Sequence, residues 1–353
     1  MKPKQKKQEW KKILSQSIRS LSELADINEE DREQLGPVIS KYPMRINPYY
    51  FGLIKRKNDP IYRQCIPNKQ ELMNEKGLED PLNEDGYSPL VGITHRYPDR
   101  VLFLISSQCA MYCRFCNRKR KVGTEGLVTE ESIGKGIGYI QDHREIRDVL
   151  LSGGDPLLLE NRELDEILSQ IRSIPHVEII RIGTRVPCTL PQRITPELTR
   201  TLKKYHPLYI HTQFNHPNEI TEESSSACER LADAGLPLGC QTVLLKDIND
   251  NPSVMKTLMQ KLLTIRVRPY YLFQADHARG TAHFWTPLKK GLEIIKALHG
   301  HTSGLCVPHF AVDLSGGGGK ILMTPDNIID NNGSELIIEN FMGKTYRYPI
   351  NPG

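Results

Sequence analysis

The sequence has no apolar run long enough to cross a membrane. Its longest run, at residues 101–105, has the length of a strand, whereas a membrane helix needs about 18 apolar residues or more. The basic N-terminus, MKPKQKKQEWKK, is not followed by the apolar segment that a secretory signal carries. We therefore expect a cytoplasmic protein with no membrane partner.

The sequence also has little net charge for its length. The 47 Lys and Arg against 42 Asp and Glu leave a formal charge of +5, which is no electrostatic sign of nucleic-acid binding. With 353 residues, of which 38% are hydrophobic, the chain is long enough to bury a substantial core. This composition excludes collagen-like and largely disordered proteins.

Short apolar runs alternate with amphipathic segments in the second and third quarters of the chain. The runs begin at Val101, Asp148, Val177, Leu208, Leu238 and Arg268. This alternation predicts an α/β protein with a parallel sheet, namely a partial (β/α)6 barrel. We expect an N-terminal helical region and linker at residues 1–95, the barrel core at 96–305, and a short β-rich segment at 306–353. Asp26 or Asn28 is expected to cap a helix in the first region.

Eight cysteines do not indicate disulfides in a reducing compartment. Five have no close sequence partner and are expected to be small buried hydrophobic residues: Cys65, Cys188, Cys228, Cys240 and Cys306. The other three, Cys109, Cys113 and Cys116, follow the first apolar run with the spacing C-x3-C-x2-C.

Three thiolates on one loop can bind one inorganic centre. Structural zinc takes four ligands, and no further Cys or His lies close enough in sequence to supply the fourth. A [4Fe-4S] cluster held by three cysteines leaves one iron open to another ligand. This spacing is similar to that of the radical S-adenosylmethionine (SAM) superfamily, which implies that the open iron binds SAM.

Two glycine-rich segments add to this pattern. SGGDP follows the next strand, where Gly153 and Gly154 let backbone approach a ligand and Asp155 offers an acceptor. FAVDLSGGGGK ends in Lys320 but departs from the phosphate-binding loop pattern, because Leu314 replaces its first glycine. A lysine on such a turn can instead form a Schiff base with an aldehyde cofactor.

Several motifs in order resemble the lysine 2,3-aminomutase family over about residues 40 to 349. They are CAMYCRFCNRKRKVG, HRYPDR, LSGGDPLLL, LPQRITPEL, FNHPNEITEES, ADAGLPLG, IRVRPYYLFQ, HFWTPLKKGLEII and GHTSGLCVPHFAVDLSGGGGK. The resemblance implies a radical SAM barrel, a [4Fe-4S] cluster, SAM and pyridoxal 5'-phosphate (PLP). It further implies an isomerase that moves the α-amino group of lysine to the β-carbon through a PLP aldimine and a 5'-deoxyadenosyl radical.

The resemblance also implies roles for individual residues. Cys109, Cys113 and Cys116 would bind the cluster, and Lys320 would carry PLP. Gly153, Gly154 and Asp155 would contact SAM. The remaining implied contacts are Arg118 with the substrate carboxylate, Arg96 with the PLP phosphate, and Arg100 and Gln241 near the cofactors.

Two acids bear on the substrate. Asp276 and Asp313 match positions that hold the distal ammonium of lysine in this family, and a buried cation requires such counter-charge. Glutamate would need a basic residue there, whereas arginine and ornithine satisfy the same charge rule. The alternatives are therefore a mutase for another amino acid, an enzyme that makes β-lysine for elongation factor P, or a non-enzymatic iron-sulfur or zinc module.

The sequence departs from the longer family members at its C-terminus. It ends in YRYPINPG, whereas those members continue with a cysteine-rich tail that binds zinc together with a cysteine of the neighbouring subunit. Asn251 stands at the position of that partner cysteine. We therefore expect no structural zinc. The expected partners are an amino-acid substrate, an electron donor such as a flavodoxin or ferredoxin, and a second copy if the protein is a homo-oligomer.

Overall fold

The computed structural model describes residues 3–24, 29–73, 76–333 and 335–350. Its centre is a nine-stranded sheet whose strands lie in chain order. Strands β2 to β8 run parallel, and β1 and β9 pair antiparallel at the two edges. The strands are β1 (Ile93–Tyr97), β2 (Arg100–Ser106), β3 (Asp148–Gly153), β4 (Ile179–Gly183), β5 (Leu208–Thr212), β6 (Leu238–Leu244), β7 (Arg268–Gln274), β8 (His309–Leu314) and β9 (Gly319–Met323).

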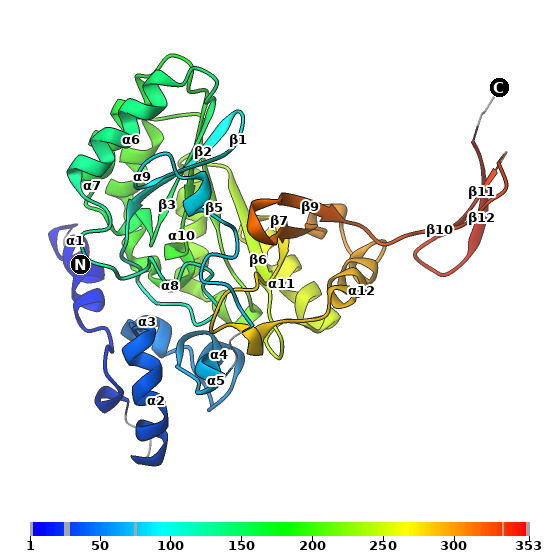
Figure 1. The fold of residues 1–353 in the computed structure, drawn as a ribbon, viewed down its shortest axis with the longest axis horizontal. Coiled ribbons are helices and arrows are strands. Elements are labelled where there is room, and N and C mark those ends of the chain that lie inside the picture. The colour runs from blue at the N-terminus through cyan, green and yellow to red at the C-terminus, as the bar shows by residue number, and fades with distance from the viewer. Residues whose placement is uncertain (1–2, 25–28, 74–75, 334, 351–353) are drawn as a thin grey trace.

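Helices connect the parallel strands and cover the outside of the sheet (Figure 1). Several begin at a threonine or asparagine that caps the first turn; Thr129, for example, accepts the backbone N–H of Ser132. The helices are α6 (Glu130–Asp142), α7 (Asn161–Arg172), α8 (Val186–Thr189), α9 (Pro196–Lys203), α10 (Glu222–Asp233), α11 (Pro252–Thr264) and α12 (Leu288–Leu298). The partial (β/α)6 barrel expected from the sequence is confirmed; α12 adds a helix that the sequence analysis had not identified.

The core lies between the sheet and these helices. Val149 and Leu151 of β3 are fully buried, and so are Leu164 and Leu168 of α7, in the same hydrophobic cluster. Val149 and Leu151 share the face of β3 that packs on the helices, whereas Leu150 and Ser152 on its other face are half-buried. The five isolated cysteines are all buried, as expected.

The N-terminal region is helical and packs below the barrel in the view of Figure 1. It contains α1 (Pro3–Ser15), α2 (Glu29–Lys41), α3 (Pro48–Phe51), α4 (Pro60–Cys65) and α5 (Gln70–Met73). The expected capping residues Asp26 and Asn28 lie outside the described residues. None of the helices in the described ranges combines the length and apolar character of a membrane span.

A second, three-stranded antiparallel sheet stands away from the barrel and is here called the arm (Figure 1). It consists of β10 (Ile328–Asn331), β11 (Glu335–Glu339) and β12 (Thr345–Pro349). The expected β-rich C-terminus is therefore confirmed. The main sheet itself runs past residue 305, because β8 and β9 both pair within it.

Candidate active site

One cavity of about 710 Å³ opens at the carboxyl ends of the parallel strands. This is the end at which parallel barrels place their ligands. Every site residue predicted from the sequence lines it: Arg96, Arg100, Cys109, Cys113, Cys116, Arg118, Gly153, Gly154, Asp155, Gln241, Asp276, Asp313 and Lys320. The structure thus brings together residues that lie more than two hundred positions apart in the chain.

The cysteine loop follows β2 and is held from outside by the N-terminal region. The backbone N–H of Tyr112 donates to the Arg45 carbonyl at 2.9 Å, and that of Arg114 donates to the Gln64 carbonyl at 2.9 Å. The side chain of Asn47 donates to the Ala110 carbonyl at 3.1 Å. These contacts fix the backbone on which the three cysteines stand.

A buried ion-pair cluster reinforces this attachment. Arg114 lies between two of the cysteines and is 2% exposed; its Nε and Nη2 donate to the two oxygens of Glu71 in α5, at 3.0 and 2.6 Å. Lys119 Nζ reaches the same carboxylate at 2.6 Å. Burial alone would raise the pKa of Glu71, but these two cations lower it. The bidentate pair therefore ties the cysteine loop to α5.

The three thiols fit an iron-sulfur cluster by their surroundings. Burial raises the pKa of Cys109 and Cys116, the latter to about 11, so the anionic form that binds metal requires positive charge nearby. Arg185 Nη1 donates to Cys113 Sγ at 2.9 Å, and the backbone N–H of Arg118 donates to Cys116 Sγ at 3.3 Å. Hydrogen bonds to cysteine sulfur are typical of iron-sulfur sites.

The same thiols do not form a site for a single ion. Within the described ranges, no three His, Cys, Asp or Glu side chains are grouped as ligands of one metal ion. The three cysteines all line the cavity. Three thiol donors beside an open space agree with a [4Fe-4S] cluster, in which one iron is left free for another ligand.

The two glycines of SGGDP are required by the protein's own backbone. Gly153 has a φ of +135°, and a Cβ there would lie 2.0 Å from the Ser106 carbonyl oxygen. A Cβ on Gly154 would lie 2.4 Å from the Gln108 carbonyl oxygen. Both glycines were predicted to let the backbone approach a ligand. In the structure they also let the backbone approach the start of the cysteine loop.

Asp155, predicted to offer an acceptor, already accepts several hydrogen bonds from the protein. Its carboxylate accepts the hydroxyl of Thr184 at 2.6 Å and the backbone N–H of Arg185 at 2.7 Å. The backbone N–H groups of Leu157 and Val186 donate to it as well, both at 3.1 Å. Because buried polar groups are satisfied internally wherever possible, Asp155 joins the loops after β3 and β4.

Lys320 and Asp313 meet because the β8–β9 hairpin pairs them across its two strands. Lys320 Nζ lies 3.4 Å from Asp313 Oδ2 and 4.7 Å from the centre of the Phe273 ring. The backbone N–H of Lys320 donates to the Tyr97 hydroxyl at 3.1 Å. The glycine-rich turn thereby places one amine beside a carboxylate at the cavity wall.

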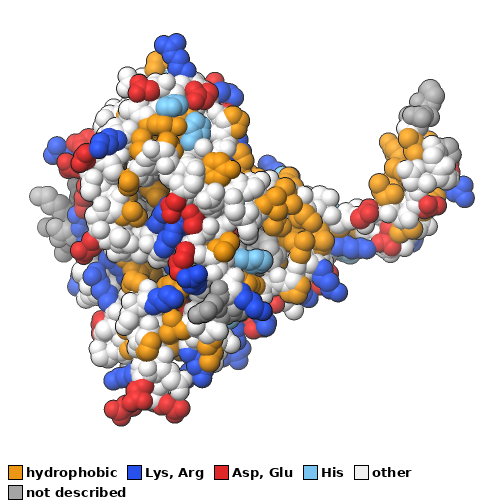
Figure 2. Space-filling model, viewed as in Figure 1, with side chains coloured by type: hydrophobic (Ala, Val, Ile, Leu, Met, Phe, Trp, Pro, Cys, Tyr) orange, Lys and Arg blue, Asp and Glu red, His pale blue; other side chains and the backbone are white. Residues whose placement is uncertain are grey.

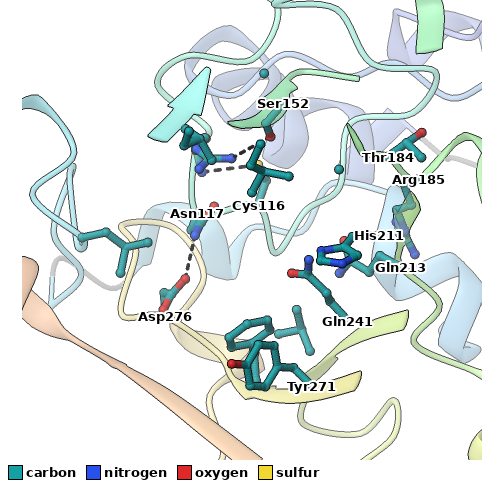
Figure 3. A pocket seen from close by; sticks show the side chains of 18 of the residues that line it. Cys116, Asn117, Ser152, Thr184, Arg185, His211, Gln213, Gln241, Tyr271 and Asp276 are labelled. Carbon is teal, nitrogen blue, oxygen red and sulfur yellow. Dashed lines mark hydrogen bonds between the residues drawn. The ribbon is translucent and has the colours of Figure 1, made fainter. Parts of the chain in front are cut away.

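Asp276 lies on the same side of the cavity, at the end of β7. Asn117, which follows the last cysteine, donates to its Oδ2 at 2.6 Å (Figure 3). Burial, and next the charge of Asp313, raise the pKa of Asp276 to about 6. Asp276 and the neighbouring Asp313, whose charge raises the pKa of Asp276, thus share this wall with Lys320.

Arg118 has a partner that the sequence analysis missed. Its Nε and Nη2 lie 2.7 and 2.6 Å from Glu84 Oε1, and its Nη1 lies 3.5 Å from the Ser152 hydroxyl. Burial alone would raise the pKa of Glu84. The positive charges of Arg118, and after it Lys121 and Arg120, lower this pKa to about 2. One feature of the sequence could have indicated this pair. The acidic residues around Glu84 are opposite in charge to the basic run that begins at Arg118.

Several buried polar atoms of the lining have no hydrogen-bond partner among the described residues. They include Arg96 Nε, Arg185 Nε, His211 Nδ1 and Thr212 Oγ1. His211, which the sequence analysis also missed as a lining residue, stays neutral because burial lowers its pKa to about 4. Unsatisfied groups of this kind are costly unless a ligand completes them, so the cavity fits polar ligands.

The two arginines expected near PLP stand at the β1–β2 edge. Arg96 donates to the Leu82 carbonyl and stacks on the Tyr87 ring at 5.3 Å. Arg100 donates to Asp99 at 2.9 Å and lies 4.0 Å from the centre of the Tyr97 ring. Their remaining N–H groups suit a phosphate. Gln241 of β6 projects toward the cavity near His211 and Gln213 (Figure 3).

Comparison with known proteins shows which families this chain resembles. Residues 103–256 match the radical SAM superfamily, and residues 295–352 match the family described as lysine-2,3-aminomutase. The L-lysine 2,3-aminomutase of Clostridium subterminale is 51% identical over 342 residues, which is 95% of this chain and 82% of that protein. The enzyme of the same name from Methanococcus maripaludis is 52% identical over 345 residues, covering 95% and 80%.

A relative with another substrate in its name is somewhat less similar. The glutamate 2,3-aminomutase of Clostridioides difficile is 44% identical over 338 residues, covering 95% of this chain and 80% of that protein. The expected resemblance is confirmed along nearly the whole chain.

Proposed function

The chain belongs to the lysine 2,3-aminomutase family of radical SAM isomerases, and we propose that its substrate is L-lysine, whose α-amino group it moves to the β-carbon. The observation that carries this proposal is the wall formed by Asp276, Asp313 and Lys320. The structure already places a lysine ammonium 3.4 Å from Asp313 there. A substrate with a distal ammonium brings the same charge to the same wall.

The residues present fit the cofactors of this family. Cys109, Cys113 and Cys116 would hold the [4Fe-4S] cluster, and Lys320 would bind PLP covalently. Arg96 would contact the PLP phosphate, with Arg100 close to the same cofactor. When bound, the cluster and SAM supply a carbon radical that removes hydrogen, and PLP supplies a conjugated ring that stabilises an unpaired electron. Gln241, Gly153 and Gly154 line the space that these groups would share.

The protein's own part in the reaction is to position the substrate. Arg118 would bind the substrate carboxylate. Its Nε and Nη2 face Glu84, but its Nη1 makes only a long contact of 3.5 Å with the Ser152 hydroxyl, so this nitrogen can still donate to a ligand. Asp276 and Asp313 would hold the distal ammonium. Fixing both ends of the substrate sets which carbon faces the cofactors, which is how positioning contributes to rate.

The charge of this wall disfavours glutamate. A side-chain carboxylate would meet two buried acids and would add a third like charge, which costs free energy in a low-dielectric site. Arginine and ornithine satisfy the charge but differ in length. An external one-electron donor, such as a flavodoxin or ferredoxin, would reduce the cluster.

The test is an anaerobic assay of the reconstituted protein with PLP, SAM and a strong reductant. Lysine, arginine, ornithine and glutamate are offered together, and the β-amino products are identified by mass spectrometry. We expect β-lysine as the main product. A different β-amino acid would contradict the proposed substrate, whereas no product from free amino acids would favour a protein-bound substrate such as elongation factor P.

Two variants separate the proposed roles. Asp313→Asn should weaken lysine binding while leaving the PLP absorbance band of a lysine Schiff base in place. Lys320→Ala should abolish that band and the activity together. A protein that keeps cluster absorbance but shows neither the band nor any product would favour a non-enzymatic iron-sulfur module.

A further inference from the structure

Arg185 makes a charged contact with one of the three cysteines. It lies directly before α8, is 8% exposed, and donates from Nη1 to Cys113 Sγ at 2.9 Å. We infer that Arg185 is a positioning residue that raises the reduction potential of a cluster bound to the three cysteines. The inference rests on the proposed function, since it requires the cluster.

The other side of the guanidinium is fixed by a buried network. Nη2 donates to Glu219 Oε1 at 2.6 Å and to Gln64 Oε1 at 2.7 Å. Glu219 is fully buried and also accepts the Tyr50 hydroxyl at 2.7 Å. A guanidinium held at both ends keeps its direction toward the sulfur.

Glu219 is itself held by the backbone after β5. The N–H groups of Asn215 and His216 donate to Glu219 Oε2 at 2.5 and 2.9 Å. Its carboxylate is therefore fixed behind Arg185, on the side away from Cys113. The order sulfur, guanidinium, carboxylate places a positive charge next to the cluster ligand and a negative charge beyond it.

This order has a defined effect on electron transfer. One electron from an external low-potential donor enters the oxidised cluster, and no bond forms or breaks in that step. The reduced cluster carries one more negative charge, so a cationic N–H donor on a ligand sulfur stabilises it more than the oxidised form. Arg185 therefore shifts the equilibrium toward reduction, and Glu219 moderates the shift.

The arrangement is particular to Cys113. Among the described residues, the side-chain hydrogen bond to the sulfurs of this loop comes from Arg185, whereas Cys116 receives only the backbone N–H of Arg118. The Arg185 guanidinium also lies 5.3 Å from the centre of the Phe115 ring, which helps to exclude water from the contact. An ionic hydrogen bond shielded from water is stronger than an exposed one.

The test is a redox titration of the reconstituted full chain, followed by the electron paramagnetic resonance signal of the reduced cluster. Arg185→Gln should lower the equilibrium constant for reduction by about tenfold, which is about 59 mV for a one-electron couple. Glu219→Gln should shift the potential in the opposite direction. Arg172→Gln is the control, because Arg172 donates to backbone carbonyls on the outside of the barrel.

Opposite shifts for the two variants, with iron content near that of the unsubstituted protein, would support the inference. A merely structural role would lower iron content and leave the potential of the loaded fraction unchanged. If Arg185→Gln does not retain a cluster, the potential of Glu219→Gln is the deciding measurement. An unchanged potential in Glu219→Gln would then overturn the inference. An unsubstituted protein that binds no cluster would overturn the proposed function and this inference with it.

Discussion

The charge state of Asp276 depends on neighbours of opposite effect. Burial and Asp313 favour its protonated form, whereas the hydrogen bond from Asn117 favours the carboxylate. The positive charges of Lys320 and Arg118 favour the carboxylate as well. A substrate ammonium at the same wall would further favour the carboxylate form of Asp276. Binding of that ammonium and loss of the Asp276 proton are therefore coupled.

Lysine binding should consequently weaken in mild acid. Below about pH 6 Asp276 takes up a proton and its attraction for the ammonium is lost, so KM for lysine should rise as pH falls. Asp276→Asn should remove this dependence and raise KM by about thirtyfold or more, because loss of one partner of a desolvated charge pair costs about 2 kcal/mol or more. Initial rates from about pH 5 to about pH 8 test both effects. An unchanged pH profile in the variant would contradict the assignment.

The same carboxylate has a predictable effect on stability. Its pKa rises from an ordinary value of 3.8 to about 6 on folding, so the folded state binds the proton more tightly than the unfolded state. The free energy of unfolding therefore falls as pH rises through that window. Asp276→Asn should melt higher than the unsubstituted protein at neutral pH and show little difference in acid; a lower melting temperature at neutral pH would refute this.

Glu84 should act on substrate binding through Arg118. Glu84→Gln removes the negative charge that fixes the Arg118 guanidinium. It should raise KM for lysine by about tenfold, because a hydrogen bond to a charged group contributes about 1.5 kcal/mol. The kcat should change less, because Glu84 holds Arg118 rather than the reacting carbons. Asp80→Asn is the matched control, since Asp80 pairs with Arg120 in the same segment. Equal effects of the two variants would show that the segment's net charge, not Arg118, is responsible.

At the scale of elements, the regular parts of the fold were readable from the sequence and the irregular contacts were not. The strands were predictable because each carries a buried apolar face, as at Val149 and Leu151 of β3, although Leu150 and Ser152 on the other face of that strand line the cavity. Glu84 was missed because it lies 34 residues from Arg118 in a segment without periodicity. The same holds for Arg185 and Cys113, which are 72 residues apart. Such pairs depend on how loops meet at one end of the barrel.

The glycine-rich turn between β8 and β9 is an element whose backbone can be tested. Gly316 and Gly317 have φ values of +75° and +89°, so a side chain at either position is strained by about 1–2 kcal/mol. A Cβ on Gly317 would also lie 2.5 Å from the Tyr87 ring, whereas one on Gly316 would meet no atom within 4 Å. Tyr87 in turn stacks on Arg96.

Gly317→Ala should therefore be the more damaging of two similar substitutions. We expect it to lower the melting temperature further than Gly316→Ala, and to weaken PLP binding because Tyr87 and Arg96 shift together. Thermal unfolding and titration of the PLP absorbance band measure the two effects. If both variants bind PLP equally well, the contact with Tyr87 does not position the cofactor site.

At the scale of the whole molecule, three regions of the chain build one cavity. The N-terminal region supplies Leu82 and Glu84, the barrel supplies the cysteine loop, and the last strand of the sheet supplies Lys320. The arm contributes no residue to the described lining. Its function must be sought on its own surface.

The arm is amphipathic across its two faces. In its register, Ile338 lies opposite Ile328 and Tyr346, and Leu336 lies opposite Tyr348, so apolar side chains share one face. The opposite face carries Thr345, the ion pair between Arg347 and Glu335, and one central apolar side chain, Ile337. Tyr346 and Tyr348 are 54% and 60% exposed, and Figure 2 shows hydrophobic side chains on the surface of the arm.

An exposed apolar sheet face of this kind should be covered in solution by a second copy of the chain. A small sheet gains stability only when its apolar face is packed, and exposed apolar patches mark association sites. Tyr348→Asp places a charge on that face and should lower the mass measured by size-exclusion chromatography with light scattering. Thr345→Asp places the same charge on the polar face and should leave the mass unchanged. An unsubstituted protein that elutes as a monomer would contradict the prediction, and equal loss of mass in both variants would place the contact elsewhere on the arm.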